Sequence, residues 1–353
     1  MTILFAILLF SFLIFIHELG HFVAAKLSGV QVNEFALFMG PAIFKKKVGE
    51  TTYSLRCIPI GGYCAMEGED ADTDNPRSFQ KAAPWKRLII LVAGAFMNFV
   101  TGVVLIAICL APAKEYISPV IAEVEPGCTI VHDGGLQIGD RFLEIDGEKI
   151  YVHGDFSMIL AIKPGEKHDI VVERNGEKLV FNDYLMEKHE FPNEDGTTGM
   201  RYGFSFGVEK YTFGKKVENV WNNAVNMIRT VRLSLQMLFS GDAGLGDLMG
   251  PVGIVGVMSD TAASAETTLD AIYTMLSFGA MLAINLAVMN LLPIPALDGG
   301  RALFLLLTVA IEKITRKKLD PKYEGYIHGV GMVLLLILMG VILFKDVFQL
   351  FVR

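Results

Sequence analysis

The segment Ile14-Phe15-Ile16-His17-Glu18-Leu19-Gly20-His21-Phe22-Val23 places a histidine-glutamate-x-x-histidine motif inside an almost uninterrupted apolar run. In a helix, His17 and His21 lie about one turn apart on the same face. Two imidazoles at that spacing can bind one Zn²⁺, and Glu18 beside them can serve as general base to the attacking water. Ionisable side chains are costly in a membrane-length apolar segment, so they usually mark a functional site. The motif therefore predicts a metal site within a membrane-spanning helix.

Composition places the chain among membrane proteins. Of its 353 residues, 52% are hydrophobic and the mean hydropathy is +0.45, which is more apolar than an ordinary soluble enzyme. The formal net charge of −7 argues against a nucleic-acid partner, because proteins that bind nucleic acid carry a basic surface. The sequence therefore predicts a membrane protein with a polar part.

Four apolar segments are long enough to cross a bilayer. They comprise residues 2–25, 88–111, 270–297 and 326–350. The first is expected to be retained rather than cleaved, because no Lys or Arg precedes its apolar run and no small-residue cleavage site precedes its histidines. In the second, a small-residue face that includes Gly94 suits close helix contact. We therefore expect a polytopic α-helical membrane protein with about four transmembrane helices.

The polar stretch between the first two spans, residues 26–87, contains a candidate β-hairpin. Residues 51–66 hold a β-like run, a turn at Pro59-Ile60-Gly61-Gly62 and a second short run. Two placements fit this pattern: a membrane-associated hairpin that dips back toward the bilayer, where protein must shield its backbone, or a surface hairpin. With the first two spans, this stretch forms an N-terminal membrane part, residues 1–111.

Residues 112–210 change character and predict a compact β-rich domain. Alternating runs are separated by turn signals such as Pro126-Gly127 and Asn175-Gly176. The segment 135–147 resembles the helix-turn-strand-turn part of PDZ domains. That resemblance implies a domain that captures an extended peptide, often by its C-terminus, at the edge of a sheet.

The remaining sequence is expected to form two parts. Residues 211–269 comprise an amphipathic helix over 214–240, which suits a membrane interface, and a loop that includes Met249–Ile254. Residues 270–353 form the C-terminal membrane part, in which a second amphipathic piece over 301–318 separates the last two spans.

A third metal ligand is expected where the third span ends. Pro293 and Pro295 break the helix shortly before Asp298. A catalytic zinc site uses three protein ligands and leaves one position open, so Asp298 is the best candidate to join the two histidines. The alternative is that Asp298 caps a helix or pairs with Arg301.

Basic residues orient the chain. Nine Lys or Arg residues lie in 26–87 and six in 301–322, and the positive-inside rule places both segments in the cytoplasm. The 112–270 region is then extracytoplasmic. His17 lies roughly 22 Å along the first span at 1.5 Å per residue, past the midplane toward the cytoplasm. Asp298 ends a span that runs inward, so both residues are expected at similar depth.

Other polar residues leave alternatives open. Asn98, Asn285 and Asn290 are amides in or near the bilayer. Asn98 is expected to hydrogen-bond between helices, with a direct part in the chemistry as the alternative. The other two are candidates to hold a substrate backbone or to donate to an oxyanion, or they bond between helices. The remaining histidines are not at ligand spacing and are expected at the surface or in packing. They are His132, His153, His168, His189 and His328.

The order of these motifs resembles the site-2 protease family of intramembrane zinc metalloproteases, in particular the bacterial regulator of sigma-E protease type with a single PDZ domain. The resemblance covers essentially the whole chain. It rests on His17-Glu18-Leu19-Gly20-His21, Pro59-Ile60-Gly61-Gly62-Tyr63, the Gly94–Asn98 segment, Gly250-Pro251-Val252-Gly253-Ile254 and the run from Asn290 to Asp298.

The resemblance implies roles for individual residues. His17, His21 and Asp298 would bind Zn²⁺, and Glu18 would be catalytic. Asn290, Pro293 and Pro295 would line the site. The 51–66 hairpin, which includes Gly61 and Gly62, would meet the substrate strand.

The resemblance also implies a function and a location. Family members cut single-span membrane proteins within the bilayer after another protease has shed the ectodomain, and their substrates are anti-sigma factors or remnant signal peptides. The expected location is a bacterial cell membrane, with the active site toward the cytoplasm and with membrane lipid around the spans. Two other functions fit parts of the pattern: a non-enzymatic PDZ adaptor with a structural metal, and a metal or proton transporter.

Overall fold

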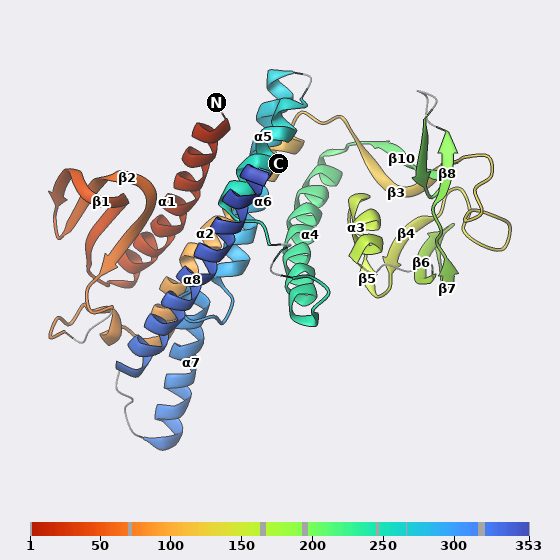
Figure 1. Ribbon diagram of the computed structural model, residues 1–353. Coiled ribbons are helices and arrows are strands. Elements are labelled where there is room, and N and C mark those ends of the chain that lie inside the picture. Colours follow the sequence, from red (N-terminus) through yellow and green to blue (C-terminus); the bar gives the residue numbers. More distant parts are fainter. Residues whose placement is uncertain are drawn as a thin grey trace. The chain divides into compact units, whose positions relative to one another are not determined.

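The chain forms two compact units in the computed structural model, Met1–Ile106 with Ser234–Arg353 and, separately, Ala107–Leu233 (Figure 1). The structure describes residues 2–69, 73–162, 167–192, 197–244, 246, 248–265, 267–316 and 322–352.

Four helices in the described part of the chain are long and apolar enough to cross a membrane, as the sequence predicts. They are α1 (Thr2–Ser28), α2 (Pro84–Leu110), α6 (Thr268–Asn290) and α8 (Lys322–Val352). The third helix is shorter than the predicted 270–297, because it ends at Asn290. Pro293 and Pro295 follow, and neither can donate the hydrogen bond that would extend it.

Shorter helices complete the first unit. They are η1 (Phe79–Lys81), α5 (Pro251–Ala263) and α7 (Asp298–Thr315). The loop predicted over Met249–Ile254 is wrong in its second half, because α5 begins at Pro251. Proline fits the first helical turn, where its missing N–H would have no partner in any case. Helix α7 replaces the predicted piece 301–318, of which residues 317–318 lie outside the described residues.

Helix α4 (Phe213–Ser240) confirms the predicted amphipathic helix and shows which face is covered. Its polar side is buried: the Arg229 side chain is 7% exposed and its Nη2 lies 2.7 Å from Oδ1 of Asp155. Trp221 and Val217, on the apolar side, are more than half exposed. The helix therefore presents apolar side chains outward, as an interfacial helix does.

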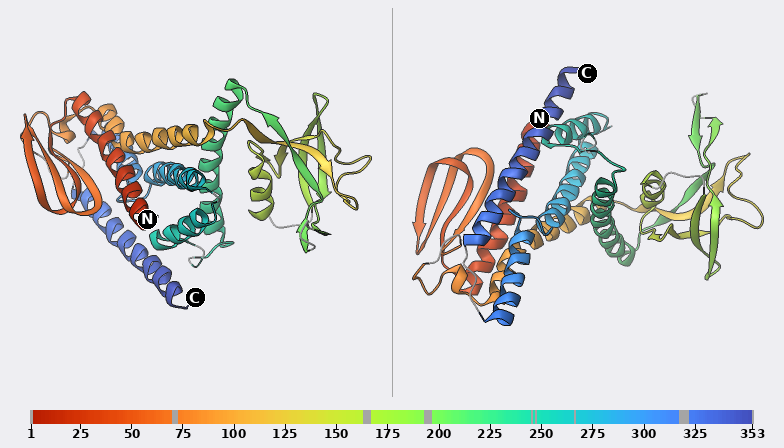
Figure 2. Two further views of the ribbon diagram at one scale, coloured as in Figure 1. Left: turned by 90° about the horizontal axis from the view of Figure 1, so that it is seen from above. Right: turned by 60° about the horizontal axis from the view of Figure 1, so that its bottom comes forward.

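The first unit also contains an antiparallel sheet of two long strands, β1 (Val32–Val48) and β2 (Thr51–Met66). Both strands contact α1, and Figure 2 shows them beside that helix in both views. The sheet and the helices share one apolar core, in which Phe35 of β1 packs with Ile90 of α2 and Leu305 of α7. Burial of such side chains holds the sheet to the ends of the helices.

The prediction that residues 51–66 form a hairpin by themselves is wrong, because the two halves of this segment pair with β1 and not with each other. Phe35 pairs with Cys64 in one part of the register and with Tyr53 in the other, so β1 lies between the two arms of the predicted hairpin. The predicted turn survives as the place where β2 changes its pairing, with Gly61 at φ +81°. Strand β1 is difficult to recognise from the sequence, because the second half of the strand is exposed and includes the polar residues Lys45–Lys47.

The second unit is built on a sheet in the order β10-β3-β4-β6-β7, with β5 paired to β4. Helix α3 (Gly154–Ile162) packs on it, and Phe142, Ile145 and Ile170 are fully buried in the shared core. A further two strands, β8 and β9, pair with each other. The strands are β3 (Glu115–Val124), β4 (Arg141–Ile145), β5 (Glu148–Lys149), β6 (Lys167–Arg174), β7 (Glu177–Leu185), β8 (His189–Pro192), β9 (Thr198–Arg201) and β10 (Phe204–Lys210).

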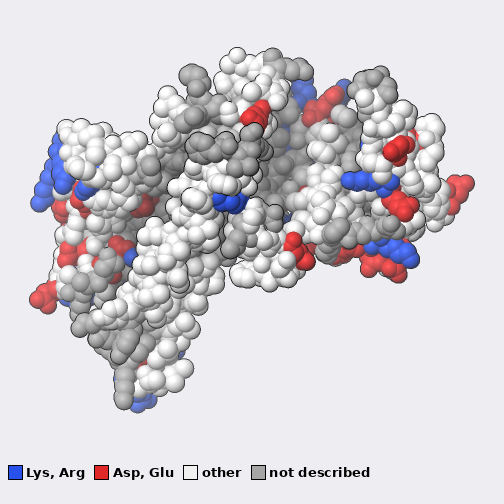
Figure 3. Space-filling model, in the orientation of Figure 1, with Lys and Arg blue, Asp and Glu red and all other residues white. Residues whose placement is uncertain are grey.

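Charged residues of the first unit gather at the edge of the β1–β2 sheet, while the helical face beside it shows few charges (Figure 3). One cluster fixes the turn between the two strands. The Glu50 carboxylate accepts hydrogen bonds from Lys26, at 2.7 Å, and from Arg77, at 2.6 Å. These bonds from Arg77 and Lys26 lower the pKa of Glu50 to about 2, since they favour its charged form.

Protonation of Glu50 should loosen the β1–β2 turn. Because its folded pKa is depressed, its stabilising contribution is present above the ordinary value of 4.5 and is lost as pH falls toward about 2. In detergent, the unfolding temperature should therefore fall less between pH 4.5 and about 2 in Glu50→Gln than in the wild type. The matched control is Glu177→Gln, an exposed carboxylate of β7. An unchanged pH dependence in Glu50→Gln would contradict the assignment.

Candidate metal centre

Three potential metal ligands meet in the first unit. Helix α1 contributes His17 and His21, and the first residue of α7 contributes Asp298. Oδ2 of Asp298 lies 3.1 Å from Nε2 of His17 and 3.3 Å from Nε2 of His21, and the two Nε2 atoms are 3.2 Å apart. The sequence-predicted ligand set is therefore brought together, across 281 residues of chain between its first and last members.

The hydrogen bonds of His21 show what this cluster requires. Its Nδ1 lies 2.8 Å from the carbonyl oxygen of Ile90; a carbonyl only accepts, so Nδ1 carries a proton, and in the neutral ring Nε2 then presents a lone pair. That lone pair faces Oδ2 of Asp298, a buried oxygen with no hydrogen-bond donor among the described residues. Acceptor atoms this close repel one another unless a cation lies between them. The donor set of two imidazoles and one carboxylate fits Zn²⁺.

Glycines allow the helices to approach at the centre. A Cβ built on Gly94 of α2 would contact Nε2 of His21 and would lie 2.8 Å from Nε2 of His17. A Cβ on Gly20 of α1 would lie 2.8 Å from the backbone carbon of Ala93. Both contacts are too short for any side chain. The small-residue face predicted for the second span is therefore confirmed, and it faces the two imidazoles.

Asn98 has a more specific place than the sequence indicated. It is 1% exposed, and its Nδ2 lies 3.3 Å from Nδ1 of His17, so it does bond between helices and its partner is a candidate ligand. Its Oδ1 is buried without a partner among the described residues. In the opposite amide orientation, Oδ1 of Asn98 accepts a hydrogen bond from Nδ1–H of His17. In the neutral ring, Nε2 of His17 then directs its lone pair toward the centre.

Comparison with known proteins identifies the family. The model of the family described as "Peptidase family M50" matches residues 5–338. The chain belongs to this peptidase family.

A relative from Clostridium perfringens is 39% identical over 350 residues, with 98% of each chain covered. Zinc metalloprotease RasP of Shouchella clausii is 30% identical, with 99% of each chain covered. RasP of Geobacillus kaustophilus is 28% identical, covering 98% of this chain and 97% of its own. The resemblance to site-2 proteases is thereby confirmed.

The β1–β2 sheet of this M50 metalloprotease approaches Glu18. A Cβ on Gly62 would lie 3.6 Å from Cγ of Glu18 and 3.0 Å from the carbonyl oxygen of Ala36, so this point of β2 admits only glycine without rearrangement. About two turns earlier on α1, the Ser11 hydroxyl donates a hydrogen bond to the Pro59 carbonyl oxygen at 3.2 Å. The Gly61–Gly62 segment and the glutamate of the motif are therefore neighbours.

No described hydrogen bond connects the other predicted site residues to the cluster. Asn285 and Asn290 are half-buried on α6. Pro293 and Pro295 lie in the connection that leads to α7. One alternative for Asp298 was an ion pair with Arg301. In the structure the Arg301 guanidinium pairs with Glu69.

Gly94→Ala should displace both imidazoles, because the added methyl group would occupy their space. We expect zinc affinity to fall by about tenfold or more, the scale of losses seen when groups that orient ligands are changed. Zinc content and competition with a chromophoric chelator measure the effect. The control is Gly102→Ala on the same helix, whose Cβ would meet Cγ1 of Ile284 instead. Equal losses of affinity in both variants would contradict this role of Gly94.

Asn98→Ala should weaken zinc binding by about 10- to 100-fold, because His17 would lose the partner that fixes its ring and tautomer. The same chelator competition measures it. Thr101→Ala is the control, since the Thr101 hydroxyl bonds only within α2, to the Met97 carbonyl oxygen at 2.9 Å. Wild-type affinity in Asn98→Ala would show that the contact with His17 does not orient the ligand.

Proposed function

We propose that this protein is a zinc-dependent intramembrane endopeptidase that cleaves transmembrane segments of single-span membrane proteins. The observation that carries the proposal is a cluster in which His17 and His21, on a helix long and apolar enough to cross a membrane, meet Asp298 at the start of α7. Such a cluster has three protein ligands, which leaves one position of a tetrahedral site for the reaction.

The chemistry divides between a bound metal and Glu18. His17, His21 and Asp298 would hold the Zn²⁺, which when bound would supply Lewis acidity at the scissile carbonyl and lower the pKa of the reacting water. Glu18 follows His17 in α1, on the side where β2 approaches. Its carboxylate takes the proton of the attacking water and delivers it to the nitrogen of the leaving amine, so the peptide bond breaks without releasing an unstable anion.

Substrate presentation is assigned to the β1–β2 sheet. A transmembrane helix hides all its backbone polar groups in its own hydrogen bonds, so a protease must unwind it before cleavage. An extended segment can then be held by adding it to a sheet as a further strand. The proximity of Gly61–Gly62 to Glu18 supports this role. Asn285 and Asn290 are proposed to hold the substrate backbone or the oxyanion.

The wider setting follows the family and the charge distribution. We place the protein in a bacterial cell membrane as a multi-pass protein, with the metal centre toward the cytoplasm. The substrates proposed are anti-sigma-factor-like proteins or remnant signal peptides, cut after their ectodomains are shed. The β-rich second unit is proposed as an extracytoplasmic PDZ-like domain that binds a peptide C-terminus, and the exposed apolar side of α4 supports contact with lipid.

The structure offers less support for the alternatives. A structural zinc site is closed by four protein ligands, whereas the cluster among the described residues has three. Glu18 would also have no role in an adaptor. A transporter would be expected to show repeats of its spans, which the sequence does not.

Glu18→Gln should abolish cleavage of a coexpressed, truncated single-span protein while zinc remains bound, since only the proton acceptor is lost. Product formation should fall by at least about 100-fold, the lower end of general-base effects. Asp298→Asn should instead lose both zinc and activity. Immunoblotting measures cleavage and metal analysis measures zinc. Wild-type processing by Glu18→Gln would refute the proposed function.

A further inference from the structure

The third ligand is carried by a backbone that needs outside support. Residues 291–297 connect the end of α6 to Asp298. Ala296, two residues before the ligand, has φ +78°, a left-handed conformation that costs strain for any residue with a side chain. Such a conformation persists only where surrounding contacts hold it.

One of these contacts comes from α8. The backbone N–H of Ala296 donates to Nδ1 of His328 at 2.9 Å. Of the two predicted roles for His328, surface or packing, the structure shows packing: its side chain is 11% exposed, and its ring packs edge-on against Phe304 with centroids 5.3 Å apart. Nδ1 accepts a hydrogen bond here, so in the neutral ring Nε2 carries the proton.

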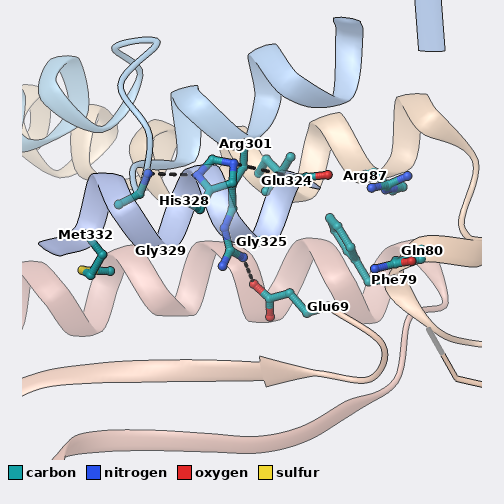
Figure 4. A pocket seen from close by; sticks show the side chains of 12 residues that line it. Glu69, Phe79, Gln80, Arg87, Arg301, Glu324, Gly325, His328, Gly329 and Met332 are labelled. Carbon is teal, nitrogen blue, oxygen red and sulfur yellow. Dashed lines mark hydrogen bonds and ion pairs between the residues drawn. The ribbon is translucent and has the colours of Figure 1, made fainter. Parts of the chain in front are cut away.

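Figure 4 shows His328 at the wall of a cavity of about 370 Å³ between α2, α7 and α8. The Nε2 side of the ring faces Glu324, at 3.9 Å, and Arg301 lies beside it, paired with Glu69. The polar contact of Nδ1 is made on the opposite side, with the Ala296 backbone (Figure 4). The ring therefore bridges a polar cavity and the connection that carries the ligand.

A second contact ties the same face of α8 to the same connection. A Cβ built on Gly331, three residues after His328, would lie 2.5 Å from Cβ of Pro295 and 2.9 Å from its carbonyl oxygen. Most of α8 is exposed, although its C-terminal part is attached to α5 through Asp346, which accepts the Gly253 N–H at 2.9 Å. His328 and Gly331 are thus two points at which α8 contacts the ligand connection.

We infer that His328 is a positioning residue of the metal centre: by accepting the Ala296 N–H it holds the left-handed backbone that directs Asp298 toward His17 and His21. The inference rests on the proposed function only in taking Asp298 as a metal ligand. It assigns to α8, a helix that contributes no ligand, an influence on metal affinity through a single hydrogen bond.

Three substitutions separate the hydrogen bond from the packing of the ring. Oδ1 of an Asn side chain lies two bonds beyond Cβ, as Nδ1 of histidine does, so His328→Asn keeps an acceptor at the required place. The acceptor of His328→Gln lies one bond farther out. His328→Phe keeps the volume of the ring without any acceptor. Leu336→Ala, at an exposed position of α8, is the control for unrelated changes in this helix.

The experiment measures zinc affinity of the full-length chain in detergent, by competition with a chromophoric chelator, and records the visible spectrum of the Co²⁺-substituted protein, which reports ligand geometry. We expect about tenfold or greater weakening in His328→Phe and His328→Gln, with an altered Co²⁺ spectrum, and near-wild-type behaviour in His328→Asn and Leu336→Ala. Thermal unfolding confirms that each variant is folded, and should His328→Phe fail to fold, the contrast between Gln and Asn decides.

Two results would overturn the inference: wild-type affinity and spectrum in the folded variants that lack the acceptor, or equal weakening in His328→Asn and His328→Gln. Because the readout is metal binding, it is separate from proteolysis. A chain that shows the expected affinity series but cleaves no single-span protein would refute the proposed function and leave the role of His328 standing.

Discussion

The gathering of two imidazole nitrogens and one carboxylate oxygen at one point is the constraint on which the rest of the first unit depends. These three atoms lie within 3.3 Å of one another, on side chains that are at most 20% exposed. Without a cation this arrangement is unfavourable, because electrostatic interactions strengthen as the dielectric falls. The fold must therefore hold the ligands in place by other contacts, and close approaches at Gly20 and Gly94 occur beside them.

Each ligand is held from a different direction. The Ile90 carbonyl orients His21, and Asn98 contacts the far nitrogen of His17. For Asp298 the described residues show no such partner at Oδ2; its backbone is set by a strained connection that α8 contacts. Groups that orient ligands tune a metal site almost as strongly as the ligands do. The spans are thus joined through the centre, and helix α2 influences it without supplying a ligand.

The same arrangement reconciles peptide hydrolysis with an apolar surrounding. A hydrolase needs a general base, an extended substrate and water, whereas the outward faces of the helices are apolar. The sheet brings the backbone of Gly62 close to Glu18, at a point where an added Cβ would be crowded against the Ala36 carbonyl oxygen at 3.0 Å. The polar cavity that includes Arg301 and Glu69 is lined in part by Ala296 of the ligand connection. Protein rather than lipid surrounds the polar groups in these two places.

The sequence by itself indicated the candidate metal ligands and the number of candidate spans. The spacing of His17 and His21 decides that they share a helix face, and the length of each apolar run decides that it can cross a bilayer. Asp298 was also predictable, because prolines break the helix just before the one carboxylate at matching depth. These features are local, and local periodicity is what a sequence displays directly.

Only the tertiary structure decided which residues support the centre. Residues 51–66 pair with β1, whose exposed lysines obscure the strand pattern in the sequence. Strand pairing depends on contacts distant in sequence rather than on local pattern. Gly94, Asn98 and His328 matter because of the atoms they meet on other helices. No spacing rule connects His328 to Ala296, because their contact depends on how α8 packs against a connection that follows a different span.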